Sequence, residues 1–296
     1  MQTKHQIQQL LSSADIIPNK RLGQHFLIDL NLMKLLVDSA NIQKNDAVLE
    51  VGCGTGSMTG LLAEKAGSVI AVELDLNLSE IAKKQLSDTK NLQIINADIL
   101  ESKHILNYSV TAALALAQQQ NRGRILLVAN LPYDVASSLM MNLLTGPTIA
   151  DAMYVTVQKE VAERMTAAPA SDSYGILSIF TGATGRTKTI RTLKPAVFWP
   201  HPKVDSAMVA FVHEEEKSER IANMELFGEI VHLFMGHRRK TLLSCSRLAQ
   251  GKLSQITNWP EIFEQCRINP TQRPETLSPD DYISIANSTR NSIFLC

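Results

Sequence analysis

The sequence has little of what marks a membrane or exported protein. No apolar run in its 296 residues approaches the roughly 20 residues that a helix needs to cross a bilayer. The N-terminal stretch MQTKHQIQQLLSSADIIPNK has neither the apolar core of a signal peptide nor the arginine-rich composition of a transit peptide. These absences predict a cytoplasmic protein with no membrane partner.

Cysteine is also scarce, and its four copies are far apart in the chain. No two form a CxxC pair, and none has a histidine at the spacing typical of metal ligands. We therefore expect neither a disulfide framework nor a metal site, which fits a reducing compartment. The four are Cys53, Cys245, Cys266 and Cys296.

The chain has no net charge, because 29 Lys and Arg balance 29 Asp and Glu. A uniform positive field that would attract nucleic acid is therefore absent. The charge is unevenly distributed, however. Residues 186–203 and 237–252 each carry five Lys or Arg and no acid, whereas acids gather at 214–216. Such clusters can bind a phosphate backbone or can simply be solvated faces, and composition alone leaves both open.

From about residue 47, short apolar runs alternate with amphipathic stretches, which is typical of a parallel sheet covered by helices. The predicted strands are 47–51, 68–73, 92–96, 124–129 and 153–157. The predicted helices are 57–66, 78–86, 105–119, 135–144, 159–166 and 176–181.

In the second part of the chain, a pair of predicted strands is followed by a charged stretch and then by a helical region. Residues 186–193 and 206–213 alternate in the manner of strands and predict an antiparallel pair at the edge of the sheet, joined by a proline-rich connection. The charged stretch HEEEKSER follows, and beyond it residues 220–290 have helical periodicity. We expect one domain over residues 1–213 and a small all-helical domain over 214–296.

A glycine-rich turn follows the first predicted strand. Gly52, Gly54 and Gly56 form GxGxG, whereas the dinucleotide-binding fingerprint is GxGxxG. The second predicted strand ends in Glu73, which can accept hydrogen bonds from ribose hydroxyls, and the third is followed by Asp98, which can accept one from an adenine amino group. Either acid alone could be an ordinary cap. Together with the turn they favour an adenosine without phosphates, as in S-adenosylmethionine.

The fourth predicted strand ends in an unusual set of residues. Its apolar run stops at Asn130-Leu131-Pro132-Tyr133, an amide, a proline and an aromatic ring in four positions. An ordinary strand end requires a turn residue but not this combination. The tetrad therefore marks a candidate site at the same edge of the sheet as the glycine turn.

Nine stretches, in order from residue 19 to about 245, form a specific set. They are NKRLGQHFLID (19–29), VLEVGCGTG (48–56), AVELD (71–75), NAD (96–98), ANLPY (129–133), VQKEVAERM (157–165), YGILS (174–178), FWPHPKVDSA (198–207) and HRRKTL (237–242). The set resembles the KsgA/RsmA family of ribosomal RNA small-subunit adenine N6-dimethyltransferases. That resemblance implies a Rossmann-like methyltransferase domain followed by a small helical domain.

The resemblance also implies a reaction. Two adjacent adenines in the 3′-terminal hairpin loop of small-subunit rRNA, within a ribosomal particle, would be dimethylated by a monomeric enzyme that uses S-adenosylmethionine. The expected cofactor-binding residues are Gln24, His25, Leu27, Gly52, Gly54, Gly56, Glu73, Asp98 and Asn130.

For the transfer itself, the resemblance places the target amine at the tetrad. The lone pair of that amine is delocalised into the ring, so the site must align it with the donor. We expect the Asn130 side chain and a backbone carbonyl of Leu131 or Pro132 to accept its two N–H groups. Tyr133 and Phe198 would stack on the flipped base. Catalysis would then rest on positioning and electrostatics, without a dedicated general base.

The basic clusters would hold RNA phosphates while the base enters the pocket. The expected contacts are Arg21, Lys203, Arg238, Arg239 and Lys240, with Lys20 as a further candidate. Two positions depart from the family pattern: Cys53 stands where proline is common, and Asp134 where asparagine is common. Asp134 adds a negative charge close to where RNA would approach.

Three alternatives remain open at this stage. The first is a dimethyltransferase of the antibiotic-resistance type, which acts on large-subunit rRNA. The second is a non-catalytic ribosome-assembly factor that has kept the fold. The third is a nicotinamide dehydrogenase, which the GxGxG turn and the lack of a placed acid–base pair disfavour.

Overall fold

The computed structural model describes residues 1–19 and 23–293. The chain forms two compact units. The sheet unit contains Met1–Ala162 and Lys188–Val212, and the helical unit contains Glu163–Thr187 and the chain from His213 onward. The helical unit thus includes residues 163–187, which the expected boundary after residue 213 would assign to the first domain.

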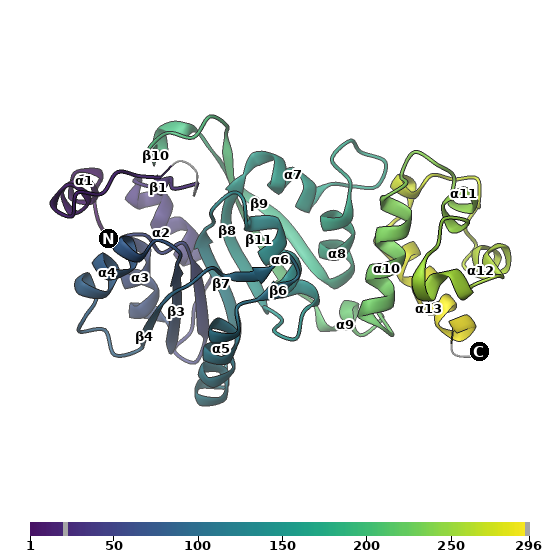
Figure 1. Ribbon diagram of the computed structural model, residues 1–296, viewed down its shortest axis with the longest axis horizontal. Helices are drawn as coiled ribbons and strands as arrows, with labels where there is room; N and C mark the ends of the chain where they lie inside the picture. The colour runs from purple at the N-terminus through teal and green to yellow at the C-terminus, as the bar shows by residue number, and fades with distance from the viewer. Residues whose placement is uncertain (20–22, 294–296) are drawn as a thin grey trace. The chain divides into compact units, whose positions relative to one another are not determined.

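One seven-stranded sheet dominates the sheet unit (Figure 1). Five neighbouring strands are parallel, and β11 runs antiparallel to β8. In spatial order the strands are β4 (Leu92–Asn96), β3 (Ser68–Glu73), β2 (Ala47–Val51), β7 (Ile125–Asn130), β8 (Ala152–Gln158), β11 (Ser206–His213) and β9 (Gly185–Leu193). The predicted strands are confirmed, and four of them have the predicted bounds.

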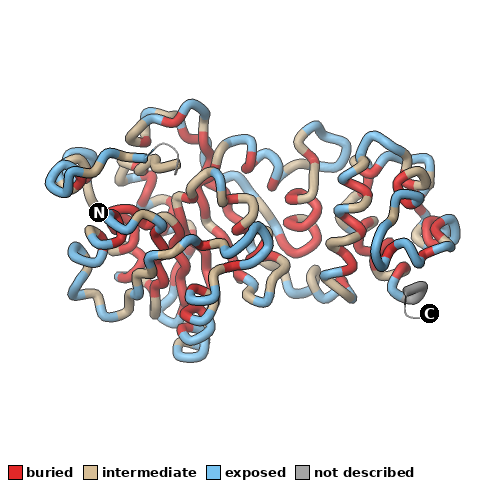
Figure 2. Tube along the Cα trace, in the orientation of Figure 1, coloured by how far each residue is buried: buried red, intermediate tan, exposed pale blue. Residues whose placement is uncertain are grey.

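Helices cover both faces of this sheet. All five residues of β2 are buried, because each strand face packs against a helix. On one face, α2 (Leu30–Ser39) and α3 (Ser57–Lys65) share a core with the strands that includes Leu36, Leu62 and Leu126. On the other lie α5 (Tyr108–Asn121) and α6 (Ala136–Thr145) (Figure 1). Figure 2 shows the strands as the buried interior of this unit.

Local capping explains where the helices begin. The predicted helix from residue 105 starts later, at Tyr108, since Ile105–Leu106 form β6, paired with β5 (Leu100–Ser102), and the Asn107 side chain caps the helix. Helix α4 (Leu76–Gln85) starts two residues before the predicted one, because the Asp75 carboxylate accepts the first free backbone N–H groups. Helix α7 (Lys159–Thr166) has the predicted bounds.

Two N-terminal elements were not predicted. Helix α1 (Lys4–Ser13) begins with a reciprocal capping box between Thr3 and Gln6. Strand β1 (Phe26–Leu27) pairs antiparallel with β10 (Phe198–Trp199), which follows the short 3₁₀ turn η2 (Pro195–Val197). The N-terminal segment is thereby joined to the proline-rich connection.

The helical unit has an aromatic core. The Phe180 ring meets Phe227 edge-on at 5.1 Å between centroids, and Phe234 packs against Phe263 and Tyr282. Among the described residues, no helix is both long and apolar enough to span a membrane. The elements are α8 (Ile176–Thr184), α9 (Glu215–Ser218), α10 (Met224–Met235), α11 (Leu242–Ser246), η3 (Gly251–Gln255), α12 (Trp259–Gln265), η4 (Pro274–Thr276) and α13 (Pro279–Ile293).

Candidate active site

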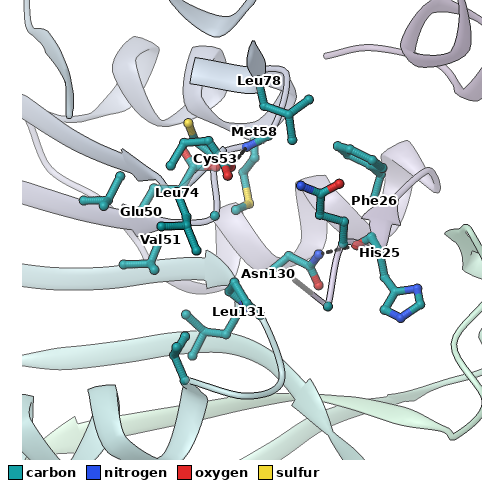
Figure 3. Close-up of a pocket in the computed structure, with 18 of the residues that line it drawn as sticks. His25, Phe26, Glu50, Val51, Cys53, Met58, Leu74, Leu78, Asn130 and Leu131 are labelled. Carbon is teal, nitrogen blue, oxygen red and sulfur yellow. Dashed lines mark hydrogen bonds between the residues drawn. The ribbon is translucent and has the colours of Figure 1, made fainter. Parts of the chain in front are cut away.

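A pocket lies where the carboxyl ends of β2, β3, β4 and β7 meet (Figure 3). This is the edge at which parallel sheets bind ligands. The structure brings most of the predicted site residues together there. Those that line the pocket are Gln24, His25, Leu27, Gly52, Gly54, Glu73, Asp98, Asn130, Leu131, Pro132 and Tyr133.

The turn between β2 and α3 depends on its glycines. Gly52, Gly54 and Gly56 have φ angles of +77°, +57° and +82°, a region that side chains with a Cβ rarely adopt. A Cβ on Gly54 would lie 2.9 Å from the Phe26 ring, and one on Gly52 would lie 3.0 Å from the Pro132 ring. Gly56 serves as the N-cap of α3 and is not among the described lining residues. The turn therefore forms a narrow backbone cradle.

Glu73 supports this cradle from β3. One carboxylate oxygen accepts the Gly54 N–H at 2.8 Å, and the other accepts the Asp75 N–H at 3.0 Å. The side chain is buried, and burial raises its pKa. Each oxygen retains a lone pair for a further donor such as a ribose hydroxyl.

Asp98 lines the pocket directly after β4 and is exposed. Its Oδ1 accepts the Leu100 N–H at 2.9 Å, which holds the carboxylate at the start of the β5–β6 hairpin. The other oxygen is available to accept a bond from a ligand amino group. Glu73 and Asp98 therefore offer two acceptors at neighbouring strand ends.

Glu50, inside β2, is a pocket residue that sequence reasoning missed. It is buried, and its Oε2 has no hydrogen-bond partner among the described residues. Burial raises its pKa to about 8, and the nearby Thr59 hydroxyl opposes part of that shift. A buried acceptor without a partner is costly unless a ligand donates to it. The signal in the sequence was an acid within an otherwise apolar strand, VLEV.

Asn130 ends β7 and faces the N-terminal segment across the pocket. Its Nδ2 donates to the backbone carbonyl of His25 at 2.8 Å (Figure 3). This bond orients the amide, and the carbonyl oxygen Oδ1 remains able to accept a hydrogen bond from a ligand. The Leu131 N–H donates to the Thr156 carbonyl at 3.1 Å, which fixes the backbone next to it.

Tyr133 completes the tetrad at the pocket. Its hydroxyl forms a 2.7 Å hydrogen bond with Ser206 Oγ, and its ring centroid lies 5.5 Å from that of His25 at an interplanar angle of 30°. Burial raises the pKa of the Tyr133 hydroxyl, so the ring remains neutral. The tetrad thus presents an amide oxygen and a neutral aromatic ring to the same cavity.

The N-terminal segment closes one side of the pocket. Gln24 Nε2 donates to Asp75 at 3.1 Å, and His25 Nδ1 lies 2.7 Å from the Pro200 carbonyl. Gln2 was not predicted; its side chain donates to the Thr55 carbonyl at 3.1 Å, on the glycine turn. Ile7 of α1, also missed, lines the pocket. The i, i+4 apolar pair Ile7 and Leu11 in the sequence could have indicated this helix.

Phe198 requires a correction. It was expected to be the second stacking face for a base, but it is fully buried. It pairs with Leu27 in the β1–β10 ladder and belongs to the same core cluster as Met208. It is not among the described lining residues, so it has no exposed face to offer a base.

None of the described residues that were expected to contact RNA is among those that line the pocket. Lys203 is exposed in the sheet unit, and Arg238, Arg239 and Lys240 are exposed in the helical unit. The Arg238 guanidinium lies 4.0 Å from the Glu275 carboxylate, a loose ion pair. Arg21 and Lys20 lie outside the described residues.

Cys53, within the glycine turn, is buried. Burial raises the pKa of its thiol well above the usual range, since a thiolate would lose its hydration. The thiol is therefore neutral, and Cys53 acts as a small packing residue.

Together, the sheet order, the glycine turn after β2 and the acids that follow β3 and β4 define a class, the S-adenosylmethionine-dependent methyltransferases with a Rossmann-like fold. The family model for "Ribosomal RNA adenine dimethylase" matches residues 18–290. The chain belongs to that family, so it is an enzyme that methylates adenine in ribosomal RNA.

Curated relatives carry the name "Ribosomal RNA small subunit methyltransferase A". The protein from Caldanaerobacter subterraneus is 36% identical over 270 residues, covering 91% of this chain and 96% of its own. The one from Alkaliphilus metalliredigens is 35% identical over 268 residues, covering 90% of each.

Solved structures agree on the fold. A dimethyladenosine transferase from Plasmodium falciparum has a TM-score of 0.73 and 21% identity, covering 89% of this chain and 97% of its own. The 23S rRNA methyltransferase ErmE has a TM-score of 0.62 and 21% identity, covering 89% and 98%. At this identity the similarity shows the fold alone.

Proposed function

We propose that this enzyme dimethylates two adjacent adenines in the 3′-terminal hairpin loop of small-subunit rRNA, within a ribosomal particle. The curated relatives support the choice of subunit, since their names assign them to it. The observation that carries the chemistry is the orientation of Asn130, whose amide nitrogen is bound to His25 and whose oxygen is left for the pocket. We propose that it acts in the cytoplasm as a monomer, with rRNA as its macromolecular partner.

The pocket residues fit S-adenosylmethionine, which supplies an electrophilic methyl group on a sulfonium. The backbone of Gly52 and Gly54 forms a cradle that a Cβ would fill. Glu73 would accept the ribose hydroxyls, and Asp98 the adenine amino group. The unpartnered Oε2 of Glu50 would accept from the ammonium group of the methionine moiety, which gives this buried carboxylate its missing donor.

The target amine would be held by acceptors from the tetrad. Asn130 Oδ1 accepts one N–H, and a backbone carbonyl of Leu131 or Pro132 accepts the other. This pair draws the nitrogen toward tetrahedral geometry and points its lone pair at the donor methyl. After one methylation a single N–H remains, and one acceptor is enough to align the amine again. Tyr133 stacks on the base and helps offset the cost of unstacking it.

No side chain needs to abstract a proton in this scheme. Asn130 is a neutral amide, and burial keeps Tyr133 protonated. The rate then comes from alignment and from oriented acceptors, and the proton leaves to water after transfer. RNA phosphates would be held by Lys203 in the sheet unit and by basic residues of the helical unit, Arg238, Arg239 and Lys240.

The decisive experiment is incubation of the enzyme with undermethylated small ribosomal subunits and labelled S-adenosylmethionine, followed by mapping of the modified bases. Protein-free large-subunit rRNA is the parallel substrate. We expect label in two adjacent adenines of the small-subunit particle. Label confined to large-subunit RNA would instead assign the enzyme to the antibiotic-resistance type, and no transfer to either would support a non-catalytic assembly factor.

A further inference from the structure

The described part of the pocket wall is acidic. Four carboxylic side chains line it, and no Lys or Arg does so among the described residues. The four are Glu50, Glu73, Asp98 and Asp134. S-adenosylmethionine carries a net positive charge, because its sulfonium adds to an ammonium and a carboxylate that cancel each other. The wall is therefore opposite in sign to the cofactor.

Three of these carboxyl groups are assigned to parts of the cofactor that the reaction leaves unchanged. Under the proposed function, Glu73 accepts the ribose hydroxyls, Asp98 the adenine amino group and Glu50 the ammonium group. Methyl transfer alters only the sulfur of the cofactor. The amine lone pair forms the new N–C bond, the S–C electron pair stays on sulfur as a neutral thioether, and the methylated amine loses a proton to water. Asp134 is the remaining carboxylate, and the sulfonium is the remaining charge.

Asp134 stands at the end of the pocket where that sulfur has to be. In-line transfer requires reacting atoms about 3–3.5 Å apart, so a target amine at the tetrad requires the sulfonium beside it. Asp134 directly follows the tetrad after β7, which is separated from β3 by one strand and from β4 by two. Since neighbouring strands are about 4.8 Å apart, the ends of β3 and β4 lie roughly 10 and 14 Å from that of β7. Glu73 and Asp98 therefore belong to the other end of the pocket.

The Asp134 carboxylate lies beside the N-terminal segment that closes the pocket. A Cβ on Gly23 would be 3.9 Å from Asp134 Oδ1 and 3.5 Å from the Tyr133 backbone nitrogen. Two residues further on, a span of at most about 7 Å, the His25 carbonyl accepts the Asn130 amide. The same short segment thus meets both the carboxylate and the tetrad amide. Because Asp134 is exposed to solvent, it brings a negative charge to this end of the pocket.

We propose that Asp134 distinguishes S-adenosylmethionine from its product, S-adenosylhomocysteine, by placing a negative charge beside the sulfonium. This inference rests on the proposed function for the position of the target amine at the tetrad. The attraction exists while the sulfur is charged and is lost on transfer, so Asp134 favours exchange of product for fresh cofactor. Two methyl groups on each of two adenines require such an exchange after every transfer. The same role accounts for a charge that would otherwise only repel RNA phosphates.

The test compares three ligands in Asp134→Asn, which removes the charge and keeps the shape of the side chain. S-adenosylmethionine has the sulfonium, sinefungin has a protonated amine in its place, and S-adenosylhomocysteine is neutral there. We expect the Kd of the two cationic ligands to rise about 3- to 10-fold, since solvent screens part of the attraction. The Kd of S-adenosylhomocysteine should remain at the wild-type value. Calorimetric titration without RNA measures all three, and asparagine, common here in the family, should leave folding intact.

Two further variants serve as controls. Asp88→Asn makes the same charge change at an exposed position that is not among the described lining residues, so all three Kd values should be unchanged. Asp98→Asn should raise all three together, because the adenine is common to the three ligands. Equal changes for the three ligands in Asp134→Asn, or no change in any, would overturn the proposal. A lower kcat with an unchanged Kd for S-adenosylmethionine would also overturn it, since the charge would then act on the target amine.

Product inhibition during turnover is a second readout. With undermethylated small subunits, the ratio of the Ki for S-adenosylhomocysteine to the KM for S-adenosylmethionine should be about 3- to 10-fold lower in Asp134→Asn than in wild type. An unchanged ratio would contradict the proposal. If the wild-type enzyme fails to methylate small subunits, the proposed substrate is wrong, whereas the three Kd values need no RNA and still decide the role of Asp134.

Discussion

Asn130 is the residue on which methyl transfer depends most directly. Asn130→Ala removes the acceptor for the target amine, and we expect kcat to fall about 10²- to 10³-fold, as when one oriented polar group is lost from an active site. The affinity for S-adenosylmethionine should change little. Single-turnover transfer of label and calorimetric titration of the cofactor measure the two effects separately.

Asn91 offers a matched control. Its Nδ2 also donates to backbone carbonyls, those of Ala63 and Ala66, but it stands just before β4, at the opposite edge of the sheet from the pocket. Asn91→Ala should therefore retain wild-type turnover. Near wild-type turnover in Asn130→Ala would contradict the proposed role of the amide.

Glu50 makes stability depend on pH. Its pKa is raised to about 8 in the fold from an ordinary value of 4.5, so between these values the folded state binds more protons than the unfolded state. The free energy of unfolding must therefore fall as pH rises from about 5 to 8. In Glu50→Gln this contribution is absent, and the variant should gain stability relative to wild type over that range. Urea denaturation at several pH values measures the difference.

The same substitution should weaken S-adenosylmethionine binding, because an amide cannot ionise opposite the cofactor ammonium as a carboxyl can. A variant more stable at pH 8 yet poorer in cofactor affinity is the expected combination. Equal pH dependence in wild type and Glu50→Gln would show that this carboxyl does not titrate in that range.

At the scale of single residues, sequence reasoning found the groups that end strands and missed those that act through burial. Glu73, Asp98 and Asn130 stand at or just after the end of a short apolar run, so their positions could be predicted. Glu50 lies within a strand, where the acid in VLEV marks the position, but its missing hydrogen-bond partner is visible only in the structure. Phe198 was misassigned because motif similarity carries no information on which way a ring faces.

At the scale of the elements, we expect the turn between β2 and α3 to be sensitive to substitution. In Gly54→Ala, a residue with a Cβ would have to adopt the left-handed backbone conformation, which costs roughly 1–2 kcal/mol. The added Cβ would also collide with the Phe26 ring. We expect cofactor affinity to fall at least about tenfold, since the cradle must open. Calorimetric titration with S-adenosylmethionine measures the loss.

Gly60 is the control within the same element. It lies inside α3, where a Cβ would meet Leu86 at an ordinary 3.5 Å. Gly60→Ala should keep cofactor affinity and raise helix stability by about 0.5–1 kcal/mol. Equal losses in both variants would mean that the turn tolerates a side chain and that Gly54 has no special role.

Elements with strong periodicity could be predicted, and short or tertiary elements could not. Strands β2, β3 and β4 are mostly apolar runs, and their bounds were predicted to the residue. Strands β1 and β10 have two residues each and exist only because they pair with one another, which a local pattern cannot show.

At the scale of the whole molecule, a protein of zero net charge must bind rRNA through local clusters. The double variant Arg238→Glu and Arg239→Glu should weaken binding to small subunits and flatten its salt dependence, because fewer counterions are released. Filter binding across a salt series measures both effects. The double variant Lys83→Glu and Lys84→Glu, on exposed positions of α4, makes the same charge change elsewhere. Equal effects in the two double variants would show that Arg238 and Arg239 contribute only through the overall charge of the protein.

The pairing of His25 with Pro200 joins residues 175 positions apart. During synthesis the parallel strands β2, β3, β4, β7 and β8 are complete by Gln158, yet the N-terminal segment then has neither β10 to pair with nor a carbonyl for the His25 ring. A nascent chain can thus hold a folded sheet and still lack a competent site. Competence should appear late in translation, after residues 198–206 leave the ribosome, and ribosome-bound chains stalled on either side of that point should differ in methyl transfer.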